Sequence, residues 1–310
     1  MTNRLRAKAL LTAAGLFLAL MPAASFACAC GCGVFEVATG AMSSTAPGLS
    51  LLFEYDFMDQ NKNWSGSSSA PASANDDKEI KTDFFTAGAQ YVFDEDWSVR
   101  LQAPFWNRSF ATDTGLGVAT FRHSAFGDVR LTGVYSGLSD DGATDISFGV
   151  KLPTGDFHYA GFDRDTEIGT GSTDALIGLY HGGALSGDEN WSWYTQLMWD
   201  KPLASQGGYT PGAEFDGAAG IAYAITLGGD VQLTPLLQLI GSSRARDGGI
   251  NADPPDTGYN RLLLSPGIEA DFQRWKLYGD VEFPVYQDMN GNQLVAPLLF
   301  KFIASYSFGA

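Results

Sequence analysis

The fourteen-residue segment Val295–Phe308, close to the C-terminus, restricts most strongly what this sequence can fold into. Hydrophobic side chains occupy every second position from Leu298 to Phe308, while Lys301 and Ser305 fall on the alternate positions. A period of two indicates a β-strand, because successive side chains point to opposite faces of a sheet. The same alternation returns along the chain in segments of roughly ten residues, the length of a tilted strand that crosses a bilayer.

An export signal precedes these segments. Three basic residues, an apolar stretch and a small-x-small cleavage site that ends at Ala27 make residues 1–27 a signal peptide. No later run of eighteen apolar residues predicts a membrane helix, and lipid cannot satisfy the open edge of a sheet. We therefore predict a signal peptide (1–27), a Cys-rich periplasmic segment (28–47) and an outer-membrane β-barrel (48–310) in a Gram-negative bacterium.

The predicted fold is all-β, a single antiparallel transmembrane barrel of about twelve strands. Its strands are expected at residues 48–59, 81–93, 97–108, 124–136, 144–153, 172–185, 191–200, 214–226, 230–241, 259–271, 275–286 and 295–308. Short and long connections alternate between them. Bacterial barrels have this asymmetry, with short periplasmic turns and longer outer loops.

Charged residues on the inward positions predict a polar lumen. Strand parity assigns six of them to the lining, where we expect them to set the charge preference: Arg100, Asp128, Arg130, Lys151, Glu282 and Lys301. Whether these charges line an open channel or pair across an occluded one stays open. A single bulge would invert this parity locally.

The overall charge is strongly acidic. Loss of the signal peptide removes three basic residues and leaves 16 basic and 35 acidic side chains, a net charge of −19. Nucleic acid is therefore not an expected partner, because phosphate binding requires clustered Lys and Arg. The excess acid either keeps loops soluble or attracts cations to a pore mouth.

Three motifs follow one another in the middle of the chain: AFGDVRLTGVYSG (125–137), ISFGVKLPTGD (146–156) and EIGTGSTDALIGLYHGG (167–183). In this order they resemble the outer-membrane transporter family named after the meta-pathway of phenol degradation. The resemblance implies a barrel that moves small molecules, often hydrophobic or aromatic ones.

All three cysteines lie directly after the cleavage site, at Cys28, Cys30 and Cys32. Three thiolates at alternate positions could hold a soft metal such as Cu(I) or Zn(II). Lipidation of Cys28, or a flexible tail that forms an intermolecular disulfide, are the alternatives. Whether residues 33–47 plug the lumen is also open.

These features leave three candidate functions. The first is a channel or transporter that passes small solutes through a polar lumen. The second is a structural barrel whose C-x-C-x-C tail binds a soft metal or docks a periplasmic redox partner. The third, a lipid-modifying enzyme, is disfavoured because the sequence lacks a G-x-S-x-G motif and has three histidines, none of them in a recognisable nucleophile motif. We therefore expect no catalytic residues.

Overall fold

The computed structural model describes residues 47–139, 142–185, 187, 190–229 and 231–308. The predicted signal peptide and all three cysteines lie outside these ranges. Within them, helical structure amounts to two single 3-10 turns, Ala72–Ala74 and Pro254–Asp256, and neither could cross a membrane.

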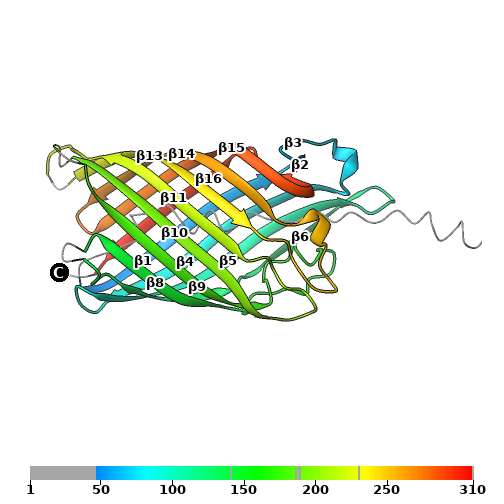
Figure 1. Ribbon diagram of the computed structural model, residues 1–310, viewed down its shortest axis with the longest axis horizontal. Coiled ribbons are helices and arrows are strands. Elements are labelled where there is room, and N and C mark those ends of the chain that lie inside the picture. Colours follow the sequence, from blue (N-terminus) through cyan, green and yellow to red (C-terminus); the bar gives the residue numbers. More distant parts are fainter. Residues whose placement is uncertain (1–46, 140–141, 186, 188–189, 230, 309–310) are drawn as a thin grey trace, which may run out of the picture.

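Sixteen strands make one antiparallel sheet that closes on itself (Figure 1). Their bounds are β1 Gly48–Gln60, β2 Lys62–Gly66, β3 Ser68–Ser69, β4 Asp77–Val92, β5 Trp97–Asp113, β6 Val118–Phe126, β7 Val129–Tyr135, β8 Thr144–Leu152, β9 Ser172–Ala184, β10 Trp191–Ser205, β11 Glu214–Tyr223, β12 Ile225–Thr226, β13 Val231–Arg244, β14 Tyr259–Phe272, β15 Trp275–Val295 and β16 Leu299–Ser307.

Twelve of these strands form the wall of the barrel, in the order β1, β4, β5, β7, β8, β9, β10, β11, β13, β14, β15, β16. The ladder between β1 and β16 closes the ring, from Ser50 opposite Ser307 to Met58 opposite Leu299. The predicted twelve-stranded antiparallel barrel is therefore confirmed. The other four strands lie outside this ring: β2, β3 and β12 are short, whereas β6 has nine residues and pairs with the far end of β5.

Two of the predicted strands are interrupted. The strand expected at 124–136 is split by Gly127 and Asp128 into β6 and β7, which both pair with β5. The strand expected at 214–226 is split at Ala224 into β11 and β12. On its other side β6 has no strand neighbour among the described residues, so the wall has a gap there.

The strand ranges predicted above leave residues 287–294 as an outer loop, and this prediction is wrong, because β15 continues as a strand to Val295. Gly291, with a φ of 62°, bends β15, and the residues after the bend pair with β2. Gln293, Leu294 and Val295 are buried, so this segment fills part of the long-loop end of the lumen instead of projecting from it.

An apolar band surrounds the outside of the barrel. On β1 the outward side chains from Leu49 to Phe57 are all apolar or aromatic, a span of nine residues that suits a tilted strand in a bilayer. At the level of Phe57 the outward positions of the next strands become polar. Asp83 on β4 is in register with Phe57, and Asn107 on β5 is in register with Asp83. Strands β4, β5 and β6 therefore extend beyond the hydrocarbon.

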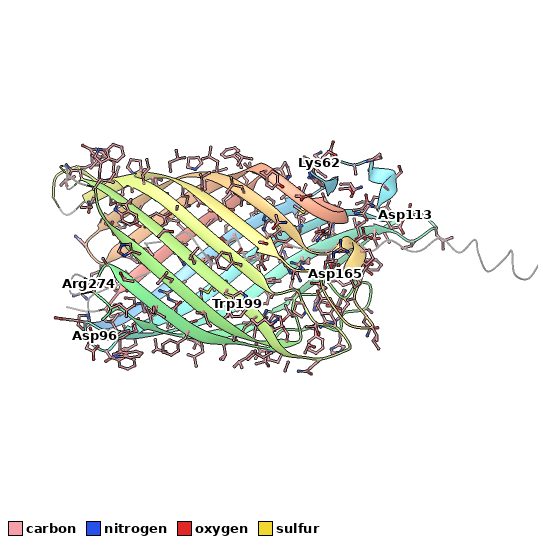
Figure 2. The ribbon with its side chains drawn as sticks, viewed as in Figure 1. Lys62, Asp96, Asp113, Asp165, Trp199 and Arg274 are labelled. Atoms are coloured by element: carbon pink, nitrogen blue, oxygen red, sulfur yellow. The ribbon has the colours of Figure 1, made fainter. Side chains whose placement is uncertain are left out.

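The two ends of the barrel differ in their connections. Asp96 and Arg274 mark the end with tight turns, whereas Asp113 and Asp165 lie at the opposite end, among the long loops (Figure 2). We call these the short-turn end and the long-loop end.

Candidate channel lumen

A layer of apolar side chains crosses the inside of the barrel. We call this layer the septum, and its members are Met58, Phe84, Trp106, Tyr194, Met198, Ala218, Ile240, Leu263, Ala296 and Leu299. Most are almost fully buried, and the Phe84 and Trp106 rings meet edge to face with centroids 4.8 Å apart. Burial of this much apolar surface stabilises the barrel in the same way as a soluble core.

The septum blocks the lumen over most of its cross-section. Its members include Phe84 on β4 and Ala218 on β11, two strands that stand six places apart in the ring of twelve and so face each other. None of its members comes from β7, β8 or β9. The arc formed by these three strands is therefore the part of the lumen that the septum does not fill.

Polar side chains form a layer beneath the septum, one inward position nearer the short-turn end. Lys301, with 3% of its surface exposed, pairs with Glu54 at 3.1 Å and lies 3.8 Å from Asp56. On the neighbouring strands Asp280 accepts hydrogen bonds from Ser265 at 2.8 Å and from Gln238 at 2.9 Å. This half of the lumen is packed, and its buried carboxyl groups surround the cation of Lys301.

A cavity of about 990 Å³ occupies the other side and extends to Glu54 and Asp56 at the edge of the packed half. It reaches the short-turn end, where Asp96, Trp97 and Ser136 line it, and rises along β7, β8 and β9. At the long-loop end its lining includes Arg164 and Ile168 of the loop between β8 and β9. The cavity has the size of a small-molecule site.

Ion pairs run along the cavity wall from strand to strand. Arg130 on β7 lies in register beside Lys151 on β8, which lies beside Asp174 on β9. Lys151 forms a short ion pair with Asp174 and lies 3.6 Å from Asp200 on β10, while Arg130 is 4.0 Å from Asp200. The basic side chains lie on β7 and β8 and the acidic ones on β9 and β10, so the wall carries a lateral charge separation.

The structure divides the six predicted lumen residues into two groups. Arg100, Asp128, Arg130 and Lys151 line the cavity. Glu282 and Lys301 also point into the barrel, but they are buried in the packed half and do not line the cavity. Glu282 is level with Leu299 of the septum. Their predicted effect on charge preference stays a prediction.

Asp128 has a structural task that its position in the sequence did not reveal. Its carboxylate accepts hydrogen bonds from the backbone N–H of Gly155 at 2.9 Å and of Thr170 at 2.8 Å. The hydroxyl of Thr154 donates to the carbonyl of Gly127 at 3.1 Å and accepts from the N–H of Val129 at 2.9 Å. The three sequence motifs at 125–137, 146–156 and 167–183 therefore meet at this point of the wall.

The alternation of side chains along each strand did not predict the septum, nor the residues that hold the loop between β8 and β9 over the cavity. Met58, Leu299 and Ile240 are apolar side chains at inward positions, a signal that was present in the sequence but was not interpreted. No group of three or more His, Cys, Asp or Glu in the described ranges is arranged to hold a metal ion.

Comparisons with known proteins identify the fold. No family model and no curated protein matches the sequence. The COG4313 outer membrane channel from Pseudomonas putida F1 has a similar structure, with a TM-score of 0.66 and 12% identity over 88% of this chain and 100% of that chain. The β-domain of the Bordetella autotransporter BrkA has a TM-score of 0.50 and 13% identity over 84% and 100%. Neither is described as an enzyme. The fold is thus that of outer-membrane β-barrels.

Removing the charge of Lys301 should destabilise the barrel. The change Lys301→Met leaves Glu54 and Asp56 buried without their cation, and we expect a loss of about 3 to 5 kcal/mol in the free energy of unfolding. The half-buried Lys276, which pairs with Glu269 at 3.1 Å, is the matched control, and Lys276→Met should cost only about 0 to 1 kcal/mol.

The measurement is urea unfolding of both variants in lipid vesicles. The triple variant Lys301→Met, Glu54→Gln, Asp56→Asn should recover part of the loss, because it removes two of the carboxylates that face Lys301, while Asp280 and Glu282 remain. Equal stability of the two single variants would show that the buried pair does not support the fold.

Proposed function

We propose that this barrel is an outer-membrane channel that passes small solutes along the arc formed by β7, β8 and β9. The observation that carries the proposal is the cavity, which runs from the mouth at the short-turn end to the underside of the loop between β8 and β9. Over this distance the septum leaves a continuous path. The similarity to an outer membrane channel of Pseudomonas putida supports the same function.

The lining supports a preference for cations. Thirteen acidic and six basic residues line the cavity, and three of the acids, Asp94, Glu95 and Asp96, stand together at its mouth. A narrow passage with an excess of one sign concentrates counter-ions and repels ions of the same sign. We therefore propose that cationic and neutral solutes enter more readily than anions.

The edge of the septum supports solutes with an apolar part. Phe84, Trp106 and Met198 contribute to the cavity wall, and Leu176 on β9 joins them. An apolar wall beside a few polar groups is typical of small-molecule sites. Together with the resemblance to the phenol meta-pathway transporters, this makes hydrophobic or aromatic molecules the proposed substrate class. Binding of Cu(I) or Zn(II) by Cys28, Cys30 and Cys32 also stays a proposal.

Ion selectivity in a planar bilayer tests the channel. The folded protein should give discrete conductance steps and a reversal potential of cation-selective sign under a salt gradient. The variant Glu95→Gln, Asp96→Asn removes two charges from the mouth, and we expect the cation-to-anion permeability ratio to fall by roughly a factor of two.

A control variant removes two charges that do not line the cavity. Glu79→Gln with Asp113→Asn alters the long-loop end, outside the lining, and should leave the permeability ratio unchanged. A barrel that is folded but gives no current under any condition, or one selective for anions, would refute the proposal.

A further inference from the structure

The loop between β8 and β9, residues 153–171, covers the long-loop end of the cavity. We call it the lid. It lies beside the edge of β6 that has no strand neighbour in the described part of the chain, above the apolar band. Its residues Arg164, Glu167 and Ile168 line the top of the cavity. The lid is therefore part of the layer between the cavity and the outside, together with Tyr209, Pro211 and Gly212 of the loop between β10 and β11.

The two ends of the lid, at Gly155 and Thr170, lie close together, and we call this place the neck. Asp128 binds the backbone N–H of Gly155 at one end of the lid and that of Thr170 at the other, so a single carboxylate ties both ends together. Gly155 and Gly169 lie so close that a Cβ on either would meet the backbone of the other. A compact loop whose ends are held together can move as one body about them.

Side chains fasten the outer side of the lid to β6. The His123 ring stacks on Tyr159 with centroids 4.0 Å apart, and its Nε2 lies 2.9 Å from a carboxylate oxygen of Asp156. The Tyr159 hydroxyl donates to the carbonyl of Arg122 at 3.0 Å. Backbone pairing is limited to one long contact, from the N–H of Asp156 to the carbonyl of Phe126 at 3.4 Å. Such side-chain contacts can break without disturbing the wall.

A second set of contacts holds the middle of the lid inside the barrel. Phe162 packs in a buried apolar cluster with Ile80, Phe110 and Leu294. Arg108 on β5, 1% exposed, donates to the carbonyls of Thr166 at 2.6 Å and Glu167 at 3.1 Å.

The closed lid also contains groups that oppose closure. Burial raises the pKa of Asp163 to about 6, with a further contribution from Asp76. Burial likewise raises the pKa of Glu167 to about 7, and it raises the pKa of Asp165 well above its usual range together with the charges of Asp163 and Asp247. These carboxylates are stripped of water in the closed position, and opening would hydrate them.

The charged and titratable groups that face these carboxylates come from several elements. The lid itself contributes Asp156, His158, Tyr159 and Arg164. The wall and its extensions contribute Asp76, Asp77, Arg108, His123 and Asp128. Tyr209, Asp247 and Arg244, which pairs with Asp247, come from the neighbouring long-loop end. The set holds five carboxyl groups, three arginines, two histidines and two tyrosines.

We propose that residues 153–171 are the gate of the channel, a lid that turns about the neck held by Asp128 and opens when its middle leaves β6 and Arg108. This inference rests on the proposed channel function. Solute enters the cavity from the long-loop side when the lid is open and leaves toward the short-turn end.

Reversible cross-linking tests the gate directly. In a background with Cys28, Cys30 and Cys32 changed to Ser, the pair His123→Cys and Tyr159→Cys is joined by a short, reducible thiol cross-linker. We expect the joined lid to reduce conductance at least tenfold, and reduction to restore it. The control pair Ser109→Cys and Arg122→Cys joins β5 to β6, which are in register there, and should leave conductance unchanged.

A second measurement separates the lid from the channel. Ile168, 1% exposed on the inner side of the lid, is changed to Cys and labelled with a membrane-impermeant maleimide from the long-loop side. Labelling should proceed in the reduced protein and stop when the lid is joined to β6. If neither the labelling rate nor the conductance changes when the cross-link forms, the proposal that residues 153–171 are a gate is refuted. Labelling that depends on the cross-link, with no current in either state, would uphold the moving lid and refute the channel.

The lid should respond to pH. Carboxyls whose pKa is raised in the closed lid favour closure fully below about pH 4, and this contribution is lost as the pH rises through 6 to 7. We expect the open fraction to rise roughly tenfold between pH 5 and pH 8, measured as open probability in a planar bilayer. Asp163→Asn with Glu167→Gln should flatten this rise, while Glu79→Gln should not. An open probability that falls with rising pH would contradict the proposal.

Discussion

Closure of the sheet through the ladder between β1 and β16 is the constraint on which the rest of the structure depends. In lipid an open edge would leave backbone groups without partners, so the ring must close and each strand must keep its register. Closure then fixes which side chains face inward. Twelve strands enclose more space than one layer of side chains fills evenly, and the chain fills it on one side only, with the septum and the charge layer around Lys301.

The unfilled side has a shape that follows from this asymmetry. Because β7, β8 and β9 contribute nothing to the septum, their inward residues line a cavity and not a core. Their charges, from Arg130 and Lys151 to Asp174, pair sideways along the wall. Across the top of the same arc the wall is interrupted at Gly127 and Asp128, and the lid covers the interruption. The gap, the cavity and the lid thus occupy one sector of the barrel.

The sequence allowed the strands, the outward band and the inward position of charges such as Lys151 to be predicted, because a period of two is a local property of each strand. The septum could not be predicted in this way. Whether Phe84 meets Ala218 depends on how far the strands are staggered around the ring, which alternation within a strand does not contain. The position of the lid depends on Arg108, some sixty residues away, and the continuation of β15 to Val295 depends on pairing with β2.

The measurement that tests the account most directly is block of the current by a bulky thiol reagent applied from the short-turn side. Ser147→Cys on β8 lines the cavity, whereas Ser265→Cys on β14 replaces a fully buried residue in the packed half. In a background with the native cysteines changed to Ser, modification should reduce the current of Ser147→Cys severalfold and leave that of Ser265→Cys unchanged. Block of Ser265→Cys with no effect on Ser147→Cys would place the path through the half of the barrel that we describe as closed.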